Sequence, residues 1–373
     1  PILIPSATPW YKHQRDHNNV NHQPTDQDII SLDKSMTSNK DFVCYGLIST
    51  AEIGLKAHIP AGKQSINSEI ISISSRSASK AELTAKKYGI KKWFPSYQEQ
   101  ISDPDIDAVI NVLPNSLHCE WSIKAAESGK HILCEKPLGL SVEECQRMID
   151  AANINNVLLV EAFTHRWNPH LRKARELISK GAIGTIVTID ASLNFPAKPK
   201  NNIRFSDSLG GGALWDVGSY VVYAARYVLA AEPIRVYGVS HDSGNWGVDT
   251  TFCGLMQFEG GAIANITGSM EELFLCHISI NGSNGRIEIP NMFDDSGPII
   301  ITTVDRQDCK TEQTITVPAP DRFMAQLDEF SCCILTEKHP EFPADDGLKN
   351  TAILEALYES ARLGRAVDVK LPE

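Results

Sequence analysis

The chain has 373 residues, of which 42% are hydrophobic and 22% charged, and its formal net charge is −11. This length allows two domains with separate cores, whereas the acidic balance argues against nucleic acid or an anionic membrane as a partner. No apolar run approaches the roughly 18 residues that a membrane-spanning helix needs, and nine cysteines without a Cys-x-x-Cys motif argue against a disulfide framework, so we expect a reducing compartment, most simply the cytoplasm.

Residues 1–40 are predicted to form an extension outside the first domain. They are polar, rich in Asn, Gln, Asp and His, and show no sustained hydrophobic period, which favours partial disorder. Met36 is a candidate original start of the protein. His13 and His17 have the spacing of helical metal ligands, but in a polar tail this spacing arises by chance more often than from a metal site, so we expect no bound metal.

From residue 41 to residue 163, short apolar strands alternate with helical patterns. Strands are expected at 42–48, 70–74, 106–113, 131–134 and 157–160, and helices after Gly54 and at 80–88, 121–128 and 142–152. Several of these strands are apolar on both faces, and the βαβ alternation is typical of a parallel sheet covered by helices. The sequence therefore predicts a doubly wound α/β domain over 41–163.

The pattern changes over 164–373, where strands follow one another with few helices between them. Strands are expected at 186–193, 235–240, 251–258, 262–267, 277–281, 286–289 and 299–304, and helices at 169–179, after Gly212, and at 323–335 and 348–363. Gly260-Gly261 between two of the strands is a hairpin signal. This order predicts an α+β domain with a large, mostly antiparallel sheet.

The turn after the first strand is the expected resting place of a dinucleotide pyrophosphate. Ser49 and Ala51 stand where the first two glycines of the usual fingerprint would be, and only Gly54 is retained. Small side chains still permit close approach of the backbone. We therefore assign cofactor binding to Ser49, Thr50, Ala51 and Ile53.

The end of the second strand bears on the choice of cofactor. Folds that prefer NAD place an acid there for the ribose 2′-hydroxyl, but this chain has Ser75 and Arg76, with Lys80 nearby. Cationic groups suit the 2′-phosphate of NADP. The alternative is a solvated arginine in a turn. We predict NADP as the cofactor, with NAD second.

Lys136 follows an apolar strand and precedes Pro137, which cannot extend a sheet ladder. The lysine is thus expected at the carboxyl end of a strand, where open α/β sheets bind ligands. There it can stabilise an oxyanion or lower the pKa of a neighbouring acid. Glu135 and Lys136 are both assigned to cofactor binding.

A second polar turn follows the third strong strand. It contains Leu113, Pro114, Asn115 and His118, again at an expected carboxyl edge. Asn115 and His118 either reach the nicotinamide ribose or cap the following helix.

The stretch 210–220, Gly-Gly-Gly-Ala-Leu-Trp-Asp-Val-Gly-Ser-Tyr, feeds three glycines into a helix. Asp216 and Tyr220 are four residues apart and share one helix face. A tyrosine with a pKa near 10 is a poor base at neutral pH, but a nearby lysine ammonium favours the phenolate. We predict Tyr220 and Lys136 as a proton-transfer pair, with Asp216 orienting substrate or lysine. The alternative is that Tyr220 serves only packing.

These motifs together resemble the Gfo/Idh/MocA oxidoreductase family, from about residue 43 to the C-terminus. The resemblance rests on Glu-Lys-Pro at 135–137, Pro-Asn-x-x-His at 114–118, Glu-Ala-Phe-x-x-Arg-x-x-Pro at 161–169 and the stretch 210–220, all in family order. It implies an N-terminal Rossmann domain that binds NAD(P), a C-terminal domain whose open sheet forms a dimer or tetramer interface, and hydride transfer at a carbinol carbon. In the resemblance Lys136 matches the catalytic lysine and Asp216 the aspartate near the substrate.

Tyr220 stands where inositol dehydrogenase-like members have histidine. This departure resembles the branch of glucose–fructose oxidoreductase, NADP-dependent aldose dehydrogenases, dimeric dihydrodiol dehydrogenase and ketosugar reductases. In the same branch Arg166 is implied to line the substrate pocket, and Arg204 is a further candidate contact to substrate.

The sequence thus predicts an NADP-preferring oxidoreductase acting on a sugar or related polyol, most simply oxidation of an aldose to a lactone. Reduction of a ketosugar or ketosugar nucleotide is the second reading and oxidation of a trans-dihydrodiol the third. A catalytically silent NADP-binding regulator and an NAD-assisted glycosidase are the rivals from other classes.

Overall fold

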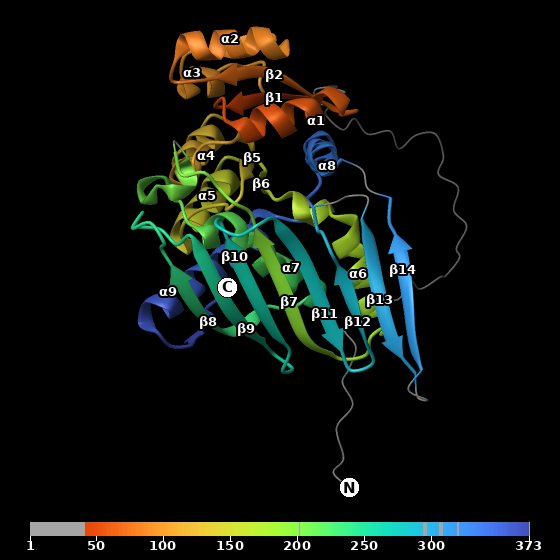
Figure 1. Ribbon diagram of the computed structural model, residues 1–373. Helices are drawn as coiled ribbons and strands as arrows, with labels where there is room; N and C mark the ends of the chain where they lie inside the picture. Colours follow the sequence, from red (N-terminus) through yellow and green to blue (C-terminus); the bar gives the residue numbers. More distant parts are fainter. Residues whose placement is uncertain (1–41, 201, 294–296, 306–308, 319–320, 373) are drawn as a thin grey trace, which may run out of the picture. The chain divides into compact units, whose positions relative to one another are not determined.

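The structure is a computed structural model that describes residues 42–200, 202–293, 297–305, 309–318 and 321–372, which belong to one compact unit (Figure 1). The predicted extension over 1–40, with Met36, His13 and His17, lies outside the described residues. Within those residues, no helix is both long and apolar enough to cross a membrane.

The first sheet has six strands in the order β3-β2-β1-β4-β5-β6, all parallel. Its strands are β1 (Val43–Ile48), β2 (Ser68–Ser74), β3 (Lys92–Phe94), β4 (Ala108–Asn111), β5 (His131–Glu135) and β6 (Leu159–Ala162). The helices between them are α1 (Ile59–Gln64), α2 (Ala78–Tyr88), α3 (Tyr97–Ile101), α4 (His118–Glu127) and α5 (Val142–Ile154). This order is that of a Rossmann fold, and the predicted doubly wound parallel sheet is confirmed.

The second sheet has nine strands in the order β14-β13-β12-β11-β7-β10-β9-β8-β15. They are β7 (Ile186–Asn194), β8 (Pro233–His241), β9 (Thr251–Phe258), β10 (Ile263–Ser269), β11 (Leu275–Gly282), β12 (Gly285–Ile289), β13 (Pro298–Val304), β14 (Lys310–Thr316) and β15 (Val367–Asp368). Of its described pairs, β10 with β7 is parallel and the others are antiparallel, which confirms the predicted mostly antiparallel sheet.

One face of this second sheet is covered by α6 (Pro169–Ser179), α7 (Ser219–Leu229) and α9 (Ala344–Leu363) (Figure 1). Their apolar side chains and the inward residues of the strands form the largest buried cluster of the described residues. The opposite face keeps apolar side chains exposed, such as Val239 on β8 and Leu255 on β9.

The last two helices also pack against the first sheet. On α8 (Arg322–Thr336), Leu327 and Phe330 are buried against the core beside β1, and Ser331 hydrogen-bonds Tyr45 at 2.9 Å. The start of α9 packs into the core of the first sheet and its later turns into the core of the second. The predicted division into 41–163 and 164–373 stays a prediction, with the addition that the C-terminal helices join both cores.

Local sequence signals account for several helix boundaries. The Ser77 and Ser141 side chains accept hydrogen bonds from the backbone N–H groups of Lys80 and Glu144, which caps the N-termini of α2 and α5. Gly89 ends α2 in the left-handed region with φ of 73°. The two serines thus set where α2 and α5 begin, and Gly89 sets where α2 ends.

Among the strands and α-helices, four elements were not predicted, namely β3, α3, β14 and β15, the last of which has only two residues. The first two are only three and five residues long, too short to show a period. Strand β14, Lys-Thr-Glu-Gln-Thr-Ile-Thr, lies at the sheet edge and is exposed along almost its whole length, so it has no apolar alternation. Helix α9 begins at Ala344, four residues before the predicted start at 348.

Candidate active site

Lys136 lies where the sequence placed it, directly after β5 at the carboxyl edge of the first sheet. Its ammonium donates to Asp216 Oδ1 at 2.9 Å and to the Asp216 carbonyl at 2.7 Å. Asp216 belongs to a π-helical turn, Leu214–Gly218, that leads directly into α7. The predicted contact between the lysine of one half of the chain and the aspartate of the other is therefore present.

Asp216 lies between two cations. Arg204 Nε donates to its Oδ2 at 2.5 Å, opposite the bond from Lys136. Burial alone would raise the pKa of Asp216, but Lys136 and Arg204 outweigh it and hold that pKa at about 2. Burial opposes the charge on Lys136 too, and the Asp216 carboxylate raises the lysine pKa against it. Both groups are thus charged across the neutral range.

Tyr220 places its ring under the same ammonium, with Lys136 Nζ 4.9 Å from the ring centroid. The ring stacks on Phe163 at 4.9 Å and meets Phe293 edge-on at 5.3 Å. Burial raises the pKa of Tyr220 to about 12, although Lys136 acts to lower it. The direction of the lysine effect on the Tyr220 pKa is as predicted, but burial outweighs it.

The turn after β1 carries the strain expected of a degraded glycine motif. Ser49 has φ of 91°, a region that favours glycine and costs a side chain about 1–3 kcal/mol. A Cβ on Gly54 would lie 3.0 Å from the Leu47 methyl groups, so this glycine permits close packing of helix on strand. Thr50 is buried and Ile53 is exposed at the mouth of the turn. The backbone here fits a bound pyrophosphate.

The end of β2 lies beside this turn, since β1 and β2 are parallel neighbours. Ser75 is buried, whereas Arg76 and Lys80 are exposed. Within the described residues, Arg76 forms no ion pair. A free guanidinium beside the phosphate turn fits an additional phosphate of the cofactor.

Two polar side chains of the turn after β4 bind backbone carbonyl groups of the protein itself. The Asn115 side-chain amide donates to the Gly210 carbonyl at 2.8 Å and so ties this turn to the glycine stretch. His118 is fully buried, with Nδ1 2.8 Å from the Pro137 carbonyl and Nε2 2.9 Å from the Leu113 carbonyl. Burial lowers the His118 pKa. With both ring nitrogens facing backbone carbonyls, His118 positions the two turns and offers no nitrogen to a ribose, which corrects its assignment as a cofactor ligand.

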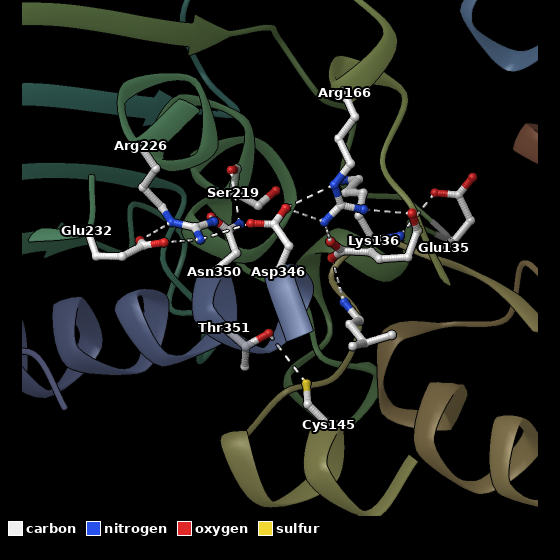
Figure 2. A network of polar contacts seen from close by, with 12 residues as sticks. Glu135, Lys136, Cys145, Arg166, Ser219, Arg226, Glu232, Asp346, Asn350 and Thr351 are labelled. Carbon is white, nitrogen blue, oxygen red and sulfur yellow. Dashed lines mark hydrogen bonds and ion pairs between the residues drawn. The ribbon is translucent and has the colours of Figure 1, made fainter. Parts of the chain in front are cut away.

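Two further predicted residues point into the protein. Glu135 Oε1 lies 2.9 Å from His58 Nε2, in the helical turn that follows the phosphate turn. Arg166 has no exposed side-chain surface and pairs with Glu161 at 2.7 Å and Asp346 at 2.9 Å (Figure 2). The expectation that Arg166 lines the substrate pocket is therefore wrong, because every nitrogen of its guanidinium is engaged inside the protein.

Sequence reasoning missed the ring cluster around Tyr220. His165 is fully buried, and its ring centroid lies 4.6 Å from that of Tyr220 and 4.8 Å from that of Phe293, both in edge-type contacts. Neither of its ring nitrogens has a hydrogen-bond partner within the described residues, and burial lowers its pKa well below the usual value. His165 occupies an unmatched position of the motif 161–169, so only its place next to Arg166 could have drawn attention to it.

A metal centre finds no support in the described part of the chain. It contains no group of three or more His, Cys, Asp or Glu side chains arranged to hold a metal ion. The predicted absence of a metal site in the tail concerns residues outside the described ranges.

Comparisons with known proteins bear on this site. The family described as "Oxidoreductase family, NAD-binding Rossmann fold" matches residues 44–163, and the "GFO/IDH/MocA C-terminal domain" matches residues 171–288. A D-xylose 1-dehydrogenase (NADP+) of Haloferax volcanii is 32% identical over 87% of this chain and 99% of its own length. The chain belongs to the Gfo/Idh/MocA oxidoreductase family. It is an NAD(P)-dependent oxidoreductase that acts on CH–OH groups.

Other Gfo/Idh/MocA proteins are similar over almost the same span. A dTDP-3,4-didehydro-2,6-dideoxy-α-D-glucose 3-reductase of Actinomadura kijaniata is 30% identical over 87% of this chain and 97% of its own. The crystal structure of an aldose–aldose oxidoreductase from Caulobacter crescentus, complexed with glycerol, has a TM-score of 0.80 at 29% identity and covers 88% of this chain and 100% of that one. A levoglucosan dehydrogenase in complex with NADH and levoglucosan has a TM-score of 0.80 at 26% identity. The match covers 89% of this chain and 100% of that one.

Proposed function

We propose that this protein is an NADP-preferring sugar oxidoreductase and that it oxidises an aldose at the anomeric carbon to a lactone. Sugar oxidoreduction is the activity that the names of its relatives share, and the xylose 1-dehydrogenase among them supports the finer proposal. The observation that carries the chemistry is the placement of Lys136 against both Asp216 and Tyr220.

Tyr220 holds the proton that the reaction moves. In oxidation its phenolate takes the hydroxyl proton of the sugar while a hydride leaves the same carbon and the C=O bond forms. In reduction the Tyr220 hydroxyl returns the proton to the carbonyl oxygen. Lys136 stabilises the phenolate, since its ammonium lies 4.9 Å from the ring centroid. A bound nicotinamide supplies the acceptor or donor of the hydride.

Asp216 and Arg204 prepare the pocket for this step. Asp216 holds the Lys136 ammonium in place through two bonds of 2.7 and 2.9 Å. Arg204 is bound to Asp216 through Nε, and its two remaining nitrogens make no hydrogen bond to a described residue. We assign these free donors to substrate hydroxyl groups, which a sugar offers in abundance.

The cofactor assignment rests on two adjacent turns. Ser49, Thr50, Ala51 and Ile53, with the backbone after β1, would hold the pyrophosphate, and Leu113, Pro114 and Asn115 would border the nicotinamide half. Ser75, Arg76 and Lys80 would receive the 2′-phosphate. The NADP in the name of the xylose dehydrogenase supports this preference, whereas the levoglucosan dehydrogenase structure is a complex with NADH.

Reduction of a ketosugar or ketosugar nucleotide is the second candidate. The raised pKa of Tyr220, about 12 because of burial, keeps its hydroxyl protonated at neutral pH, and a protonated tyrosine is ready to donate. The 3-reductase of Actinomadura kijaniata is a relative with this direction in its name.

We further propose a homodimer or homotetramer formed through the open face of the second sheet. Large apolar side chains are exposed on strands of that sheet: Val187, Tyr237, Val239, Leu255 and Ile263. A cytoplasmic location agrees with the nine cysteines, none of which forms a disulfide in the described residues.

The experiment that tests the function follows the reduced-nicotinamide absorbance while purified protein and NADP meet a panel of aldoses, inositols and dihydrodiols, with NAD in parallel. We expect a rise with one aldose and NADP. A rise only with a diol or an inositol would replace the aldose proposal. Silence across the panel, with NADPH binding intact by fluorescence, would favour the ketosugar reductase. Release of phenol from an aryl glycoside without net NADPH would favour the NAD-assisted glycosidase.

A further inference from the structure

A chain of buried ion pairs begins at the turn that carries Lys136 (Figure 2). The backbone N–H of Leu138, two residues on, donates to Glu161 Oε1 at 2.9 Å. Glu161 Oε2 accepts from Arg166 NH2 at 2.7 Å, and Arg166 Nε donates to Asp346 Oδ2 at 3.0 Å. The Lys136 turn is thus linked through three side chains to helix α9.

The same helix links onward to the segment that carries Tyr220. Asp346 Oδ1 accepts from Arg226 NH2 at 3.0 Å, and Arg226 NH1 donates to Asn350 Oδ1 at 3.0 Å. The Asn350 amide then donates to the Ser219 carbonyl at 3.3 Å. Ser219 directly precedes Tyr220, and its hydroxyl donates to the Asp216 carbonyl at 3.2 Å. Both sides of the reaction centre are therefore held by one element.

The first turns of α9 lie tightly against the Lys136 side of this path. A Cβ on Gly347 would lie 2.9 Å from Glu161 Oε2 and 3.2 Å from Leu138 Cβ. Any side chain at this position would require either the Glu161 carboxylate or the helix to shift, and either shift disturbs the ion pairs. The absence of a side chain at Gly347 is what permits the contact.

The charges of this path are almost wholly enclosed. Arg166 has 0% of its side chain exposed, Glu161 2% and Arg226 3%, while Asp346 has 25%. Enclosed ion pairs rarely stabilise a fold more than apolar residues of the same size, but removal of one partner leaves the other charge unpaired. Such a cluster is therefore better suited to fixing relative positions than to adding stability.

We propose that Asp346 is a positioning residue that, through Arg166 and Arg226, fixes Lys136 relative to Asp216 and Tyr220. The inference rests on the proposed roles of Lys136 and Tyr220. Asp346 touches neither substrate nor reacting atoms, and it acts through the two turns that carry those residues. One helix from the end of the chain thereby sets the geometry of a site built by two earlier segments.

Asp346→Asn tests this role because the amide keeps the shape but turns one oxygen into a donor that faces an arginine. We expect kcat to fall roughly 10- to 100-fold, since a misplacement of about 1 Å costs that much, while the NADPH dissociation constant changes less than about threefold. The pH at which oxidation rises should shift upward, because a displaced Lys136 stabilises the Tyr220 phenolate less. The other charged groups that act on Tyr220, namely Glu135, Asp216 and Arg322, are unaltered by the substitution.

Glu232→Gln is the matched control. Glu232 also gives a carboxylate to Arg226, at 2.6 and 2.8 Å, but it makes no described contact with Arg166 or with the two catalytic turns. This variant should lower the thermal midpoint with kcat and the pH profile unchanged. Gly347→Ala keeps every charge and should reproduce the Asp346→Asn profile; if Asp346→Asn does not fold, Gly347→Ala and Asn350→Ala carry the same test.

A double-mutant cycle separates this inference from the proposed function. In a Lys136→Ala background, Asp346→Asn should cause less than about a twofold further loss of the residual turnover, because there is no lysine left to misplace. Equal losses with and without Lys136, or an Asp346→Asn effect confined to thermal stability, would overturn the positioning role. If Lys136→Ala itself left turnover unchanged, the proposed function would fall instead.

Discussion

Asp216 and Asp346 each lie between two cationic side chains, yet the first pairing includes a partly exposed arginine and the second faces the core. Asp216 is held by Lys136 and Arg204, and the Arg204 side chain is 40% exposed. Asp346 is held by Arg166 and Arg226, whose side chains are 0% and 3% exposed. The same charge pattern therefore serves two purposes in one protein.

The difference lies in the hydrogen-bond donors that are left over. Every nitrogen of the Arg166 guanidinium donates to Glu161 or Asp346. Arg204 uses Nε alone toward described residues, so it retains donors for a ligand. Partly exposed donors without a protein partner remain available to a ligand or to water, whereas saturated buried donors serve the fold.

Loss of Lys136 should give the largest effect on catalysis. Lys136→Ala removes the ammonium that lies over Tyr220 and leaves Asp216 with one of its two cationic partners. We expect kcat to fall by roughly 10³-fold or more, as for loss of a preorganised charge that stabilises the developing oxyanion. NADPH binding should be retained. Steady-state kinetics measure kcat, and NADPH fluorescence titration measures cofactor binding. Unchanged turnover would remove Lys136 from the mechanism, and an equal loss of NADPH binding would place it at the cofactor.

Tyr220→Phe tests the proton itself, because it keeps the ring contacts with Phe163, His165 and Phe293. A loss of roughly 10²- to 10³-fold in kcat is expected from removal of an acid–base group. The wild-type pH profile gives a second readout. Oxidation needs the phenolate, whose pKa burial raises to about 12, so its rate should rise about tenfold per pH unit between about pH 7 and 10.

Reduction by the wild-type protein needs the protonated tyrosine, which predominates below that pKa, and so should be flat over the same range. In Tyr220→Phe the slope in the oxidative direction should disappear. A slope that persists in the variant would assign the titration to another group.

The contrast between the two aspartates also shows what the sequence could and could not predict. The strand positions, the parallel first sheet and the Lys136 turn follow from local patterns, namely apolar runs and a proline after a strand. The burial of Arg166 depends on Asp346, which is 180 residues away, and no local pattern records that contact. His165 was missed for the same reason, since its neighbours Tyr220 and Phe293 come from other elements. The place of Lys136 after a strand could be predicted from the sequence. The hydrogen bonds that occupy every nitrogen of Arg166 could not.

Arg166→Met should act on stability. Without the guanidinium, the buried Glu161 carboxylate is left without its cationic partner and Asp346 keeps only Arg226, a change that costs about 3–5 kcal/mol. The free energy of unfolding from urea titration measures this loss. Arg204→Met is the matched control from the exposed pair, and its effect on the unfolding free energy should stay below about 1 kcal/mol. Similar losses in the two variants would mean that Arg204 is as structural as Arg166.

Arg204→Gln should act on substrate instead. The variant loses the charged donors that we assign to sugar hydroxyl groups, so KM for the sugar should rise roughly tenfold for each charge-assisted hydrogen bond that is lost. NADPH affinity and the thermal midpoint should stay unchanged. A loss confined to kcat would show that Arg204 acts through Asp216, to which it is bound, rather than on the substrate.

Arg76→Asp should give the most selective effect, because Arg76 is exposed and forms no ion pair with a described residue. The new carboxylate repels a 2′-phosphate and accepts a hydrogen bond from a free 2′-hydroxyl. The ratio of kcat/KM for NADP to that for NAD should therefore fall about tenfold or more, with kcat for the sugar nearly constant. Lys63→Asp, which reverses a charge outside the predicted cofactor site, is the control for a general change of charge. Equal loss with both cofactors would place Arg76 away from the 2′-phosphate. Ser75 and Lys80 would then be the remaining candidates for discriminating NADP from NAD.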